Sequence, residues 1–212
     1  MKKRKNSNPA SLATCGRKSG IVRISSGRWK RTPLPVIDLD GLRPTGNRVR
    51  ETVFDWLNFL LSGFEGRSSL DMFAGSGALG LEFASRGGHA LLIEKNPGNA
   101  RSLRQVVGKL RGEESVSVRC GDALSLLGGE SGRFDVIFID PPFASGLFGE
   151  ALSLASRLLL PEGIVYLENP VEEEVEVPAS FTVIRSGKAG AVRFRLLARA
   201  GSALSGARKE EP

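Results

Sequence analysis

Four consecutive residues, Asp140-Pro141-Pro142-Phe143, join a carboxylate and an aromatic ring on a stiff segment. They follow an apolar run, residues 134–139, which predicts a buried strand. The two prolines fix two φ angles and remove two backbone donors.

An exocyclic amine of a nucleobase is a poor nucleophile. Two fixed acceptors, the Asp140 carboxylate and the Pro141 carbonyl, can hold its N–H groups and aim its lone pair. Phe143 can stack on a base taken out of its helix. The alternative is a rigid turn without chemistry.

A glycine-rich stretch, DMFAGSGALGLE, lies at residues 71–82 between a predicted strand and a predicted helix. Gly75, Gly77 and Gly80 match GxGxxG, in which the first glycines allow a tight turn and the third allows the helix to pack on the strand. Glu94 ends the next apolar run, 19 residues after Gly75, where a carboxylate can accept hydrogen bonds from both ribose hydroxyls. The pattern predicts a site for a nucleoside-containing cofactor. A glycine turn that serves helix packing alone is the alternative.

Two cofactors fit this pattern, NAD and S-adenosylmethionine. NAD places a pyrophosphate at the helix N-terminus, whereas S-adenosylmethionine has no phosphate and carries an ammonium and a sulfonium. Asp71 begins the glycine turn, where it suits a cation and would repel a pyrophosphate, so S-adenosylmethionine is favoured. Asp122, in the short sequence GDA, offers a carboxylate either to an adenine amine or to a helix N-terminus as a cap.

The elements that must position these residues alternate along the chain. Apolar runs and amphipathic patterns predict strands at residues 70–74, 90–94, 116–119, 134–139 and 163–168, and helices at 78–86, 97–110, 122–127 and 148–160. Residues 181–186 and 192–198 follow without a helix between them and predict an antiparallel hairpin. This order predicts an α/β fold with a mostly parallel sheet that is covered on both faces.

Four segments are expected along the 212 residues. Residues 1–20 are polar and aperiodic and predict a disordered basic tail. Residues 21–66 predict a small β-hairpin and a helix, and residues 67–200 the cofactor-binding domain. Residues 201–212 are small and charged and predict a frayed tail.

The charge balance points to a polyanionic partner. The chain has 30 Lys and Arg against 23 Asp and Glu, and much of the excess lies before residue 32. Such a field attracts phosphate backbones, so Arg23, Arg28, Lys30 and Arg31 are predicted to bind nucleic acid rather than only to solvate the surface. Trp29, among them, fits a core position and RNA stacking equally well.

Other classes of protein fit less well. No apolar run approaches the roughly 20 residues of a membrane span. The basic N-terminus lacks the apolar segment of a secretory signal. Cys15 and Cys120 lack the spacing of a zinc site, and Cys120 is expected to be a small buried hydrophobe. His89 opens a predicted strand after two glycines and is expected to be a turn residue rather than a general base, and Trp56 is expected in the core. These features favour a cytoplasmic protein without a metal.

Several motifs together resemble a known family. DMFAGSGALGLE, LLIEKN, GDA and FDVIFIDPPF resemble the class I S-adenosylmethionine-dependent methyltransferases that act on exocyclic amines. RISSGRWKRTPLPV, GLRPTGNRVRETVFDWL and KAGAVRFRLLAR resemble the RsmD family of bacterial small-subunit ribosomal RNA guanine-N2 methyltransferases. The resemblance runs from about residue 21 to residue 199.

The resemblance implies a Rossmann-like, seven-stranded sheet with a small N-terminal hairpin. It implies a monomeric enzyme that methylates one guanine of 16S rRNA in the 30S subunit or its late precursor. Around the S-adenosylmethionine it places Asp71, Phe73, Gly75, Gly77, Glu94, Asp122 and Ala123, with Arg43, Pro44, Thr45, Arg48 and Glu51 closing the cofactor pocket. Around the guanine it places Asp140, Pro141, Pro142 and Phe143. Gly46-Asn47 and Ala191 depart from the usual residues of the family.

Three other functions remain as alternatives. A methyltransferase for DNA adenine or cytosine amines would share Asp-Pro-Pro-Phe, but the chain has no insert large enough for a target-recognition region. A non-catalytic RNA-binding assembly protein would not need an intact Asp140 motif. An NAD dehydrogenase is disfavoured by Asp71 and by the lack of a hydride-site acid or base.

Overall fold

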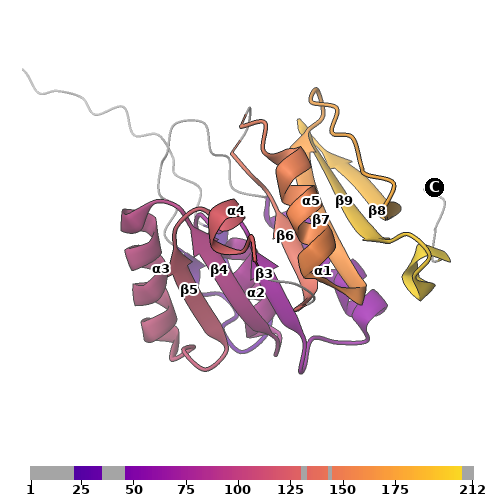
Figure 1. Cartoon of the computed structure of the whole chain (residues 1–212). Coiled ribbons are helices and arrows are strands. Elements are labelled where there is room, and N and C mark those ends of the chain that lie inside the picture. The colour runs from indigo at the N-terminus through magenta and orange to yellow at the C-terminus, as the bar shows by residue number, and fades with distance from the viewer. Residues whose placement is uncertain (1–21, 35–45, 130–132, 143–144, 207–212) are drawn as a thin grey trace, which may run out of the picture.

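The computed structural model of the chain describes residues 22–34, 46–129, 133–142 and 145–206. Seven strands form one sheet in the order β5-β4-β3-β6-β7-β9-β8 (Figure 1). Their bounds are β3 (Ser68–Asp71), β4 (His89–Glu94), β5 (Val116–Cys120), β6 (Phe134–Ile139), β7 (Leu159–Pro170), β8 (Phe181–Ala189) and β9 (Val192–Arg199). The first five are parallel, and β9 is antiparallel to both of its neighbours, β7 and β8. The predicted sheet and its C-terminal hairpin are confirmed.

The strand order reverses at β3. The chain moves from β3 outward to β4 and β5, and then returns to β6 on the other side of β3. In open parallel sheets such a reversal leaves a crevice at the carboxyl ends of the strands, where ligands bind. The glycine turn after β3 and the Asp-Pro-Pro segment after β6 both begin at this edge.

Helices cover both faces of the sheet. On one face lie α1 (Asn47–Leu61), α2 (Ala78–Ser85) and α3 (Pro97–Leu110), and on the other α4 (Ala123–Leu126) and α5 (Phe148–Leu158). Side chains alternate between the faces. On β6, Phe138 packs in a cluster with α1 and α2, whereas Ile137 and Ile139 pack with α5.

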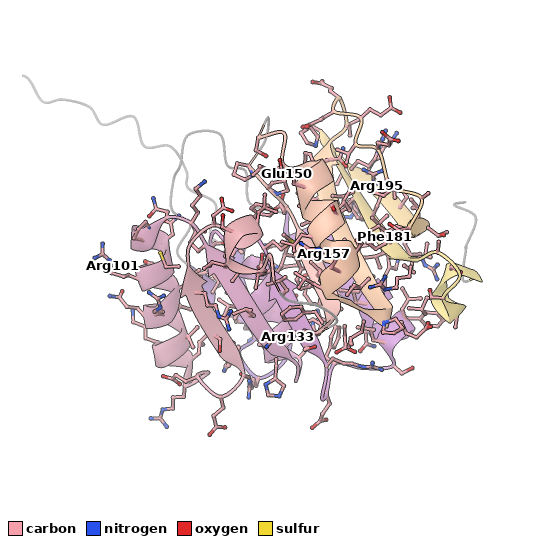
Figure 2. All side chains as sticks on the ribbon, viewed as in Figure 1. Arg101, Arg133, Glu150, Arg157, Phe181 and Arg195 are labelled. Atoms are coloured by element: carbon pink, nitrogen blue, oxygen red, sulfur yellow. The ribbon has the colours of Figure 1, made fainter. Side chains whose placement is uncertain are left out.

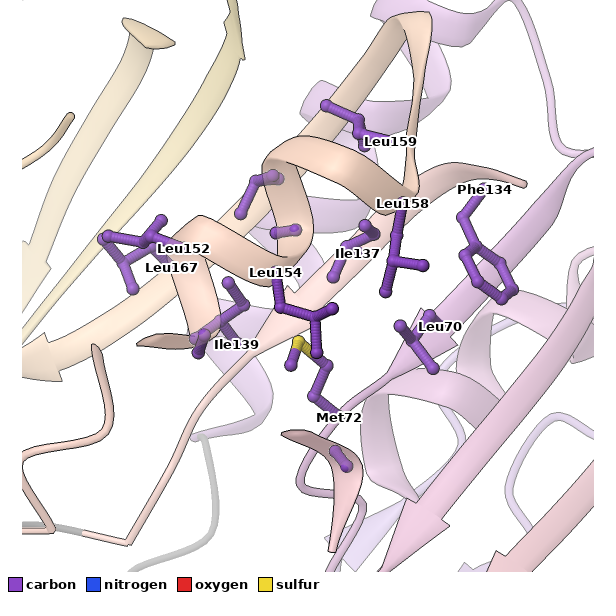
Figure 3. Close-up of a cluster of buried hydrophobic side chains, with 14 of the residues drawn as sticks. Leu70, Met72, Phe134, Ile137, Ile139, Leu152, Leu154, Leu158, Leu159 and Leu167 are labelled. Atoms are coloured by element: carbon purple, nitrogen blue, oxygen red, sulfur yellow. The ribbon is translucent and has the colours of Figure 1, made fainter. Parts of the chain in front are cut away.

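The core beneath α5 supports the edge of the sheet at which the candidate site lies. Leu152, Leu154 and Leu158 of α5 project onto strand residues that include Leu70 and Ile137 (Figure 3). Burying each such side chain contributes about 1.5–3 kcal/mol. Because this cluster reaches the ends of β3 and β6, it holds both chain segments of the predicted active site on a rigid base.

A two-stranded hairpin, β1 (Val22–Arg23) with β2 (Pro33–Leu34), docks on α2 through a buried glutamate. Glu82 is fully buried and accepts hydrogen bonds from Ser25 N (2.7 Å), Ser25 Oγ (2.8 Å) and Ser26 N (3.0 Å). Its carboxylate lies 3.7 Å from the guanidinium of Arg50, which is also fully buried, and 2.9 Å from that of Arg86. The hairpin is therefore fixed to α2 by a network of hydrogen bonds and ion pairs in which the Glu82 and Arg50 side chains are closed to solvent.

A close backbone approach adds to this docking. Arg28 N donates to the carbonyl of Ser85 (2.8 Å), and Trp29 N donates to the Ser85 hydroxyl (3.0 Å). Gly27 has a φ of 78°, and a Cβ built on it would lie 1.9 Å from the Ser85 carbonyl oxygen. Only glycine can occupy this position.

Some local expectations differ from the structure. The strand predicted at residues 70–74 is β3, Ser68–Asp71, because Met72 to Gly77 form the turn. Helix α1 begins after Gly46 without a side-chain cap and ends at Ser62, a left-handed C-cap. Ala203–Gly206, in the segment expected to fray, form a 3₁₀ helix whose Leu204 packs on the core.

The structure also shows the surroundings of Cys120, Trp29 and Trp56. Cys120 is exposed, so the prediction of a buried thiol is wrong: β5 is an edge strand and offers its last residue no outer neighbour. Trp29 is 8% exposed and belongs to a core cluster, while Trp56 is half-buried with its ring 5.6 Å from that of Phe194. No helix in the described ranges is long and apolar enough to cross a membrane.

Candidate active site

The glycine turn joins β3 to α2. Gly75 and Gly77 have φ values of 50° and 76°, which glycine adopts without strain. A Cβ on Gly80 would lie 2.6 Å from Leu92 Cδ1 on β4, so the third glycine serves the packing of α2 against the sheet. A Cβ on Gly75 would meet nothing closer than 3.9 Å, which leaves room for a ligand at the turn.

Glu94 is held at the end of β4 by two backbone donors. Its carboxylate accepts hydrogen bonds from Gly75 N (2.8 Å) and Asn96 N (2.7 Å), one at each oxygen. The side chain is largely buried, yet it lines the pocket at the strand ends. Each oxygen keeps a further lone pair, so a carboxylate fixed in this way can accept two more hydrogen bonds from one ligand.

Asp71 occupies a different position from the one that its sequence context suggests. Its carboxylate lies beneath the glycine turn, where it accepts hydrogen bonds from Gly80 N (3.1 Å) and the backbone of Phe73. It does not line the pocket formed by the described residues. Burial raises the pKa of Asp71 from 3.8 to about 7. Its direct effect is on the turn, which it ties to the first helical residues of α2.

Asp122 acts as a helix cap and also faces the pocket. One oxygen accepts hydrogen bonds from Leu124 N (3.1 Å) and Ser125 N (3.3 Å) at the start of α4. The other oxygen lies 3.1 Å from Lys95 Nζ, and this hydrogen bond lowers the pKa of Asp122. The capping interpretation is confirmed, and the pocket-facing position leaves a contact with a ligand amine open.

Gly75, Glu94 and Asp122 face one pocket of about 230 Å³ at the carboxyl ends of β3, β4, β5 and β6. The pocket therefore lies where the strand order predicts a ligand. It brings together most of the predicted cofactor residues with the first residue of the Asp-Pro-Pro segment. Its lining residues are Met72, Phe73, Gly75, Glu94, Lys95, Asn99, Gly121, Asp122, Ala123, Asp140, Pro142 and Leu147.

The Asp-Pro-Pro segment leaves β6 at the far side of this pocket. Asp140 and Pro142 line it, while Pro141 is buried beneath. Because Phe143 lies outside the described residues, the predicted stacking face stays a prediction. Arg43, Pro44 and Thr45 also lie outside them.

Two residues beside Asp140 were not found from the sequence. Ile139, the last residue of β6, pairs with Leu167 of β7, so Asp140 follows β6 at the level of Glu168, which lies within β7. The buried Tyr166 hydroxyl donates to Glu168. Burial, together with the nearby carboxylates of Glu168 and Asp140, raises the pKa of Tyr166 well above its ordinary value. A polar residue at every second position near a strand end, as in YLE, is the signal that could have revealed this pair.

The cations predicted to bind nucleic acid lie together on the hairpin, and all four are exposed. Arg23 Nη1 donates to the carbonyl of Arg31 (3.1 Å), and Arg28 donates to the hydroxyl of Ser115. The Arg28 guanidinium lies 4.3 Å from the centre of the Trp29 ring. Among the described residues, no three His, Cys, Asp or Glu side chains form a cluster that could hold a metal.

Comparisons with known proteins agree with this arrangement. A family model described as "Conserved hypothetical protein 95" matches residues 22–198. Ribosomal RNA small subunit methyltransferase D of Escherichia coli (strain K12) is 39% identical over 185 residues, which cover 85% of this chain and 91% of that protein. The protein of the same name from Haemophilus influenzae is 36% identical over 183 residues, which cover 84% and 93%.

A solved structure described as the putative methyltransferase yhhF from Escherichia coli is similar, with a TM-score of 0.75 and 36% identity. The match covers 85% of this chain and 98% of that chain. Given a family model that matches most of its length and relatives of this identity and coverage, the chain belongs to the family described as Conserved hypothetical protein 95, the RsmD family that its motifs resemble.

Proposed function

We propose that this protein transfers a methyl group from S-adenosylmethionine to the exocyclic N2 amine of one guanine in the 16S rRNA of the small ribosomal subunit. Relatives named ribosomal RNA small subunit methyltransferase D support the reaction class and the rRNA substrate. The observation that carries the proposal is one pocket in which Glu94 and Asp140 face the same space from opposite sides of the strand-order reversal.

The pocket residues fit S-adenosylmethionine. The doubly anchored Glu94 carboxylate can accept both ribose hydroxyls, and Asp122 can accept an adenine amine beside its capping contacts. The glycine turn leaves the backbone open to the ligand at Gly75. The cofactor supplies a methyl group on a sulfonium. The carboxylates of Glu94 and Asp122 in the pocket would repel a pyrophosphate, which argues against NAD.

Asp140 then acts on the amine. The lone pair of a guanine N2 amine is delocalised into the ring, and attack on a methyl carbon requires it to be localised on nitrogen. The Asp140 carboxylate and the Pro141 carbonyl can accept the two N–H groups and orient that lone pair. Positive charge develops on nitrogen in the transition state, where a fixed carboxylate stabilises it. The two prolines restrict the backbone and so keep both acceptors in position.

We propose that the rRNA is recognised within the 30S subunit or its late precursor, by a monomer acting in the cytoplasm. The exposed cations Arg23, Arg28, Lys30 and Arg31 can contact phosphates. Since Glu82 and Ser85 dock the hairpin rigidly on α2, these contacts would be held at a fixed position relative to the pocket. Arg43 and Thr45 remain candidates for closing the cofactor site.

Methylation of DNA amines is the remaining rival, because the Asp-Pro-Pro-Phe motif is shared. The test is transfer of a labelled methyl group to 30S particles, free 16S RNA and DNA, assayed side by side. We expect incorporation into the ribosomal substrates and none into DNA. Incorporation into DNA alone would refute the proposal.

A further inference from the structure

All the charged side chains on the outer face of α3 are basic. Arg101, Arg104 and Lys109 are exposed, and the helix contains no Asp or Glu. At 3.6 residues per turn the three side chains fall within a sector of about 140°. The opposite side of the helix is buried through Leu103 and Val106. Figure 2 shows Arg101 pointing outward from α3, away from the sheet.

Helix stability does not account for this pattern. Lys109 is in the last turn, where the helix dipole favours a cation. Arg101 lies in the first half of the helix, where the dipole gives a cation no advantage. The helix also offers it no acidic partner three or four residues away. Arg104 donates to the carbonyl of Val118 on β5 (3.2 Å), so its guanidinium is held over the edge strand.

This face connects the pocket to the N-terminal hairpin. Lys95, just before α3, and Asn99, in its first turn, line the pocket. After the end of α3, a Cβ on Gly112 would lie 2.8 Å from the Trp29 ring, and the Ser115 hydroxyl accepts from Arg28. The 14 residues of α3 span about 21 Å. Cations therefore continue from the mouth of the pocket to the hairpin loop.

The local charge is large compared with that of the whole chain. Residues 95–119 carry six Lys and Arg and only two acidic residues, Glu113 and Glu114, for a net charge of +4 out of +7 in all. A basic surface of this kind attracts a phosphate backbone over several nucleotides.

We propose that the outer face of α3, carried by Arg101, Arg104 and Lys109, binds the phosphate backbone of the RNA whose base enters the pocket. The inference rests on the proposed function and extends it, since it adds a second contact surface beyond the hairpin. Phosphate contacts of this kind fix the register of the substrate without reading its sequence.

The test compares two double variants. Arg101→Gln/Lys109→Gln removes two cations of the α3 face. Arg133→Gln/Arg157→Gln removes two exposed cations elsewhere on the molecule (Figure 2). Binding to 30S particles and to 16S RNA is measured across a salt series, and cofactor binding is measured by calorimetry. The α3 variant should weaken RNA binding and flatten the log–log salt slope by roughly 1.4 to 1.8, at about 0.7 to 0.9 for each phosphate contact. The control should keep the wild-type slope, and both should keep cofactor affinity.

The possible failures can be told apart. If the wild type methylates rRNA but the α3 variant keeps the wild-type slope, or changes no more than the control, the α3 surface is wrong and the proposed function stands. If the wild type neither binds nor methylates rRNA, both are wrong. Loss of cofactor binding in the α3 variant would also overturn the inference, because the effect would then lie in the pocket.

Discussion

The carboxylate of Glu94, at the end of β4, accepts the backbone N–H of Gly75 at 2.8 Å and so ties the acid of one strand to the glycine turn that follows the neighbouring strand. The acid is thus both a candidate ribose acceptor and a support for the turn, which the sequence spacing alone does not distinguish.

Replacing Glu94 should weaken cofactor binding. Glu94→Ala removes the charged acceptor and frees the amides of Gly75 and Asn96, so S-adenosylmethionine should bind about 2–3 kcal/mol more weakly. Glu94→Gln keeps one acceptor oxygen and should lose less. Calorimetry with S-adenosylmethionine and NAD measures both. Unchanged affinity in Glu94→Ala, or tight binding of NAD alone, would contradict the assignment.

Replacing Asp140 should affect turnover rather than cofactor binding. Asp140→Ala removes an acceptor that acts mainly in the transition state, and should lower the methylation rate by roughly 10²-fold or more. Asp140→Asn keeps an acceptor oxygen but no charge, so its methylation rate should fall between those of the wild type and Asp140→Ala. Single-turnover methylation of 30S particles measures the rate. Near-normal turnover in the alanine variant would make Asp140 purely structural.

Removing the buried carboxylate of Glu82 should loosen the hairpin. Glu82→Ala leaves the Arg50 guanidinium buried without its partner and frees three donors of Ser25 and Ser26. We expect the free energy of unfolding to fall by about 3–5 kcal/mol. Amide exchange should rise first in residues 22–34. Glu113→Ala, an exposed glutamate, serves as the control. Equal effects of the two variants would rule out the docking role.

The pH dependence of stability should report on Asp71. Its pKa rises from 3.8 to about 7 on folding, because the carboxyl is buried. The folded state therefore keeps a proton that the unfolded state has lost. This lowers the free energy of unfolding as the pH rises from about 4 to about 7, by at most about 4 kcal/mol. Asp71→Asn cannot titrate, so its stability relative to the wild type should improve across this window. Urea unfolding at about pH 4 and about pH 7 measures the free energies of unfolding of the wild type and Asp71→Asn. If the two proteins differ by the same amount at both pH values, the raised pKa of Asp71 is contradicted.

The sequence predicted the fold well because its signals are local. Alternating apolar runs and helical patterns mark the strands and helices, and glycines mark the end of β3 and the start of β4. Right-handed crossovers restrict the topologies of a parallel sheet, whereas the strand order itself came from the structure. The spacing from Gly75 to Glu94 placed two residues that do meet, because parallel neighbouring strands end at one edge.

What the sequence missed depends on contacts between distant segments. Glu82 reads as an ordinary helical glutamate, and only the fold brings it to Ser25, 57 residues earlier in the chain. Asp71 looks like a ligand for a cation, but the turn folds over it. Cys120 follows an apolar run and looks buried, yet its strand lies at the sheet edge. Burial is decided by neighbours in space.

The most direct test of the central claim is the identity of the methylated nucleoside. Wild-type protein and Asp140→Ala are incubated with 30S particles and labelled S-adenosylmethionine, and the digested RNA is separated and identified by mass spectrometry. We predict one labelled product, N2-methylguanosine, formed by the wild type and strongly reduced with Asp140→Ala. A labelled methyl group on an adenine or cytosine amine, or equal labelling by the two proteins, would contradict the account.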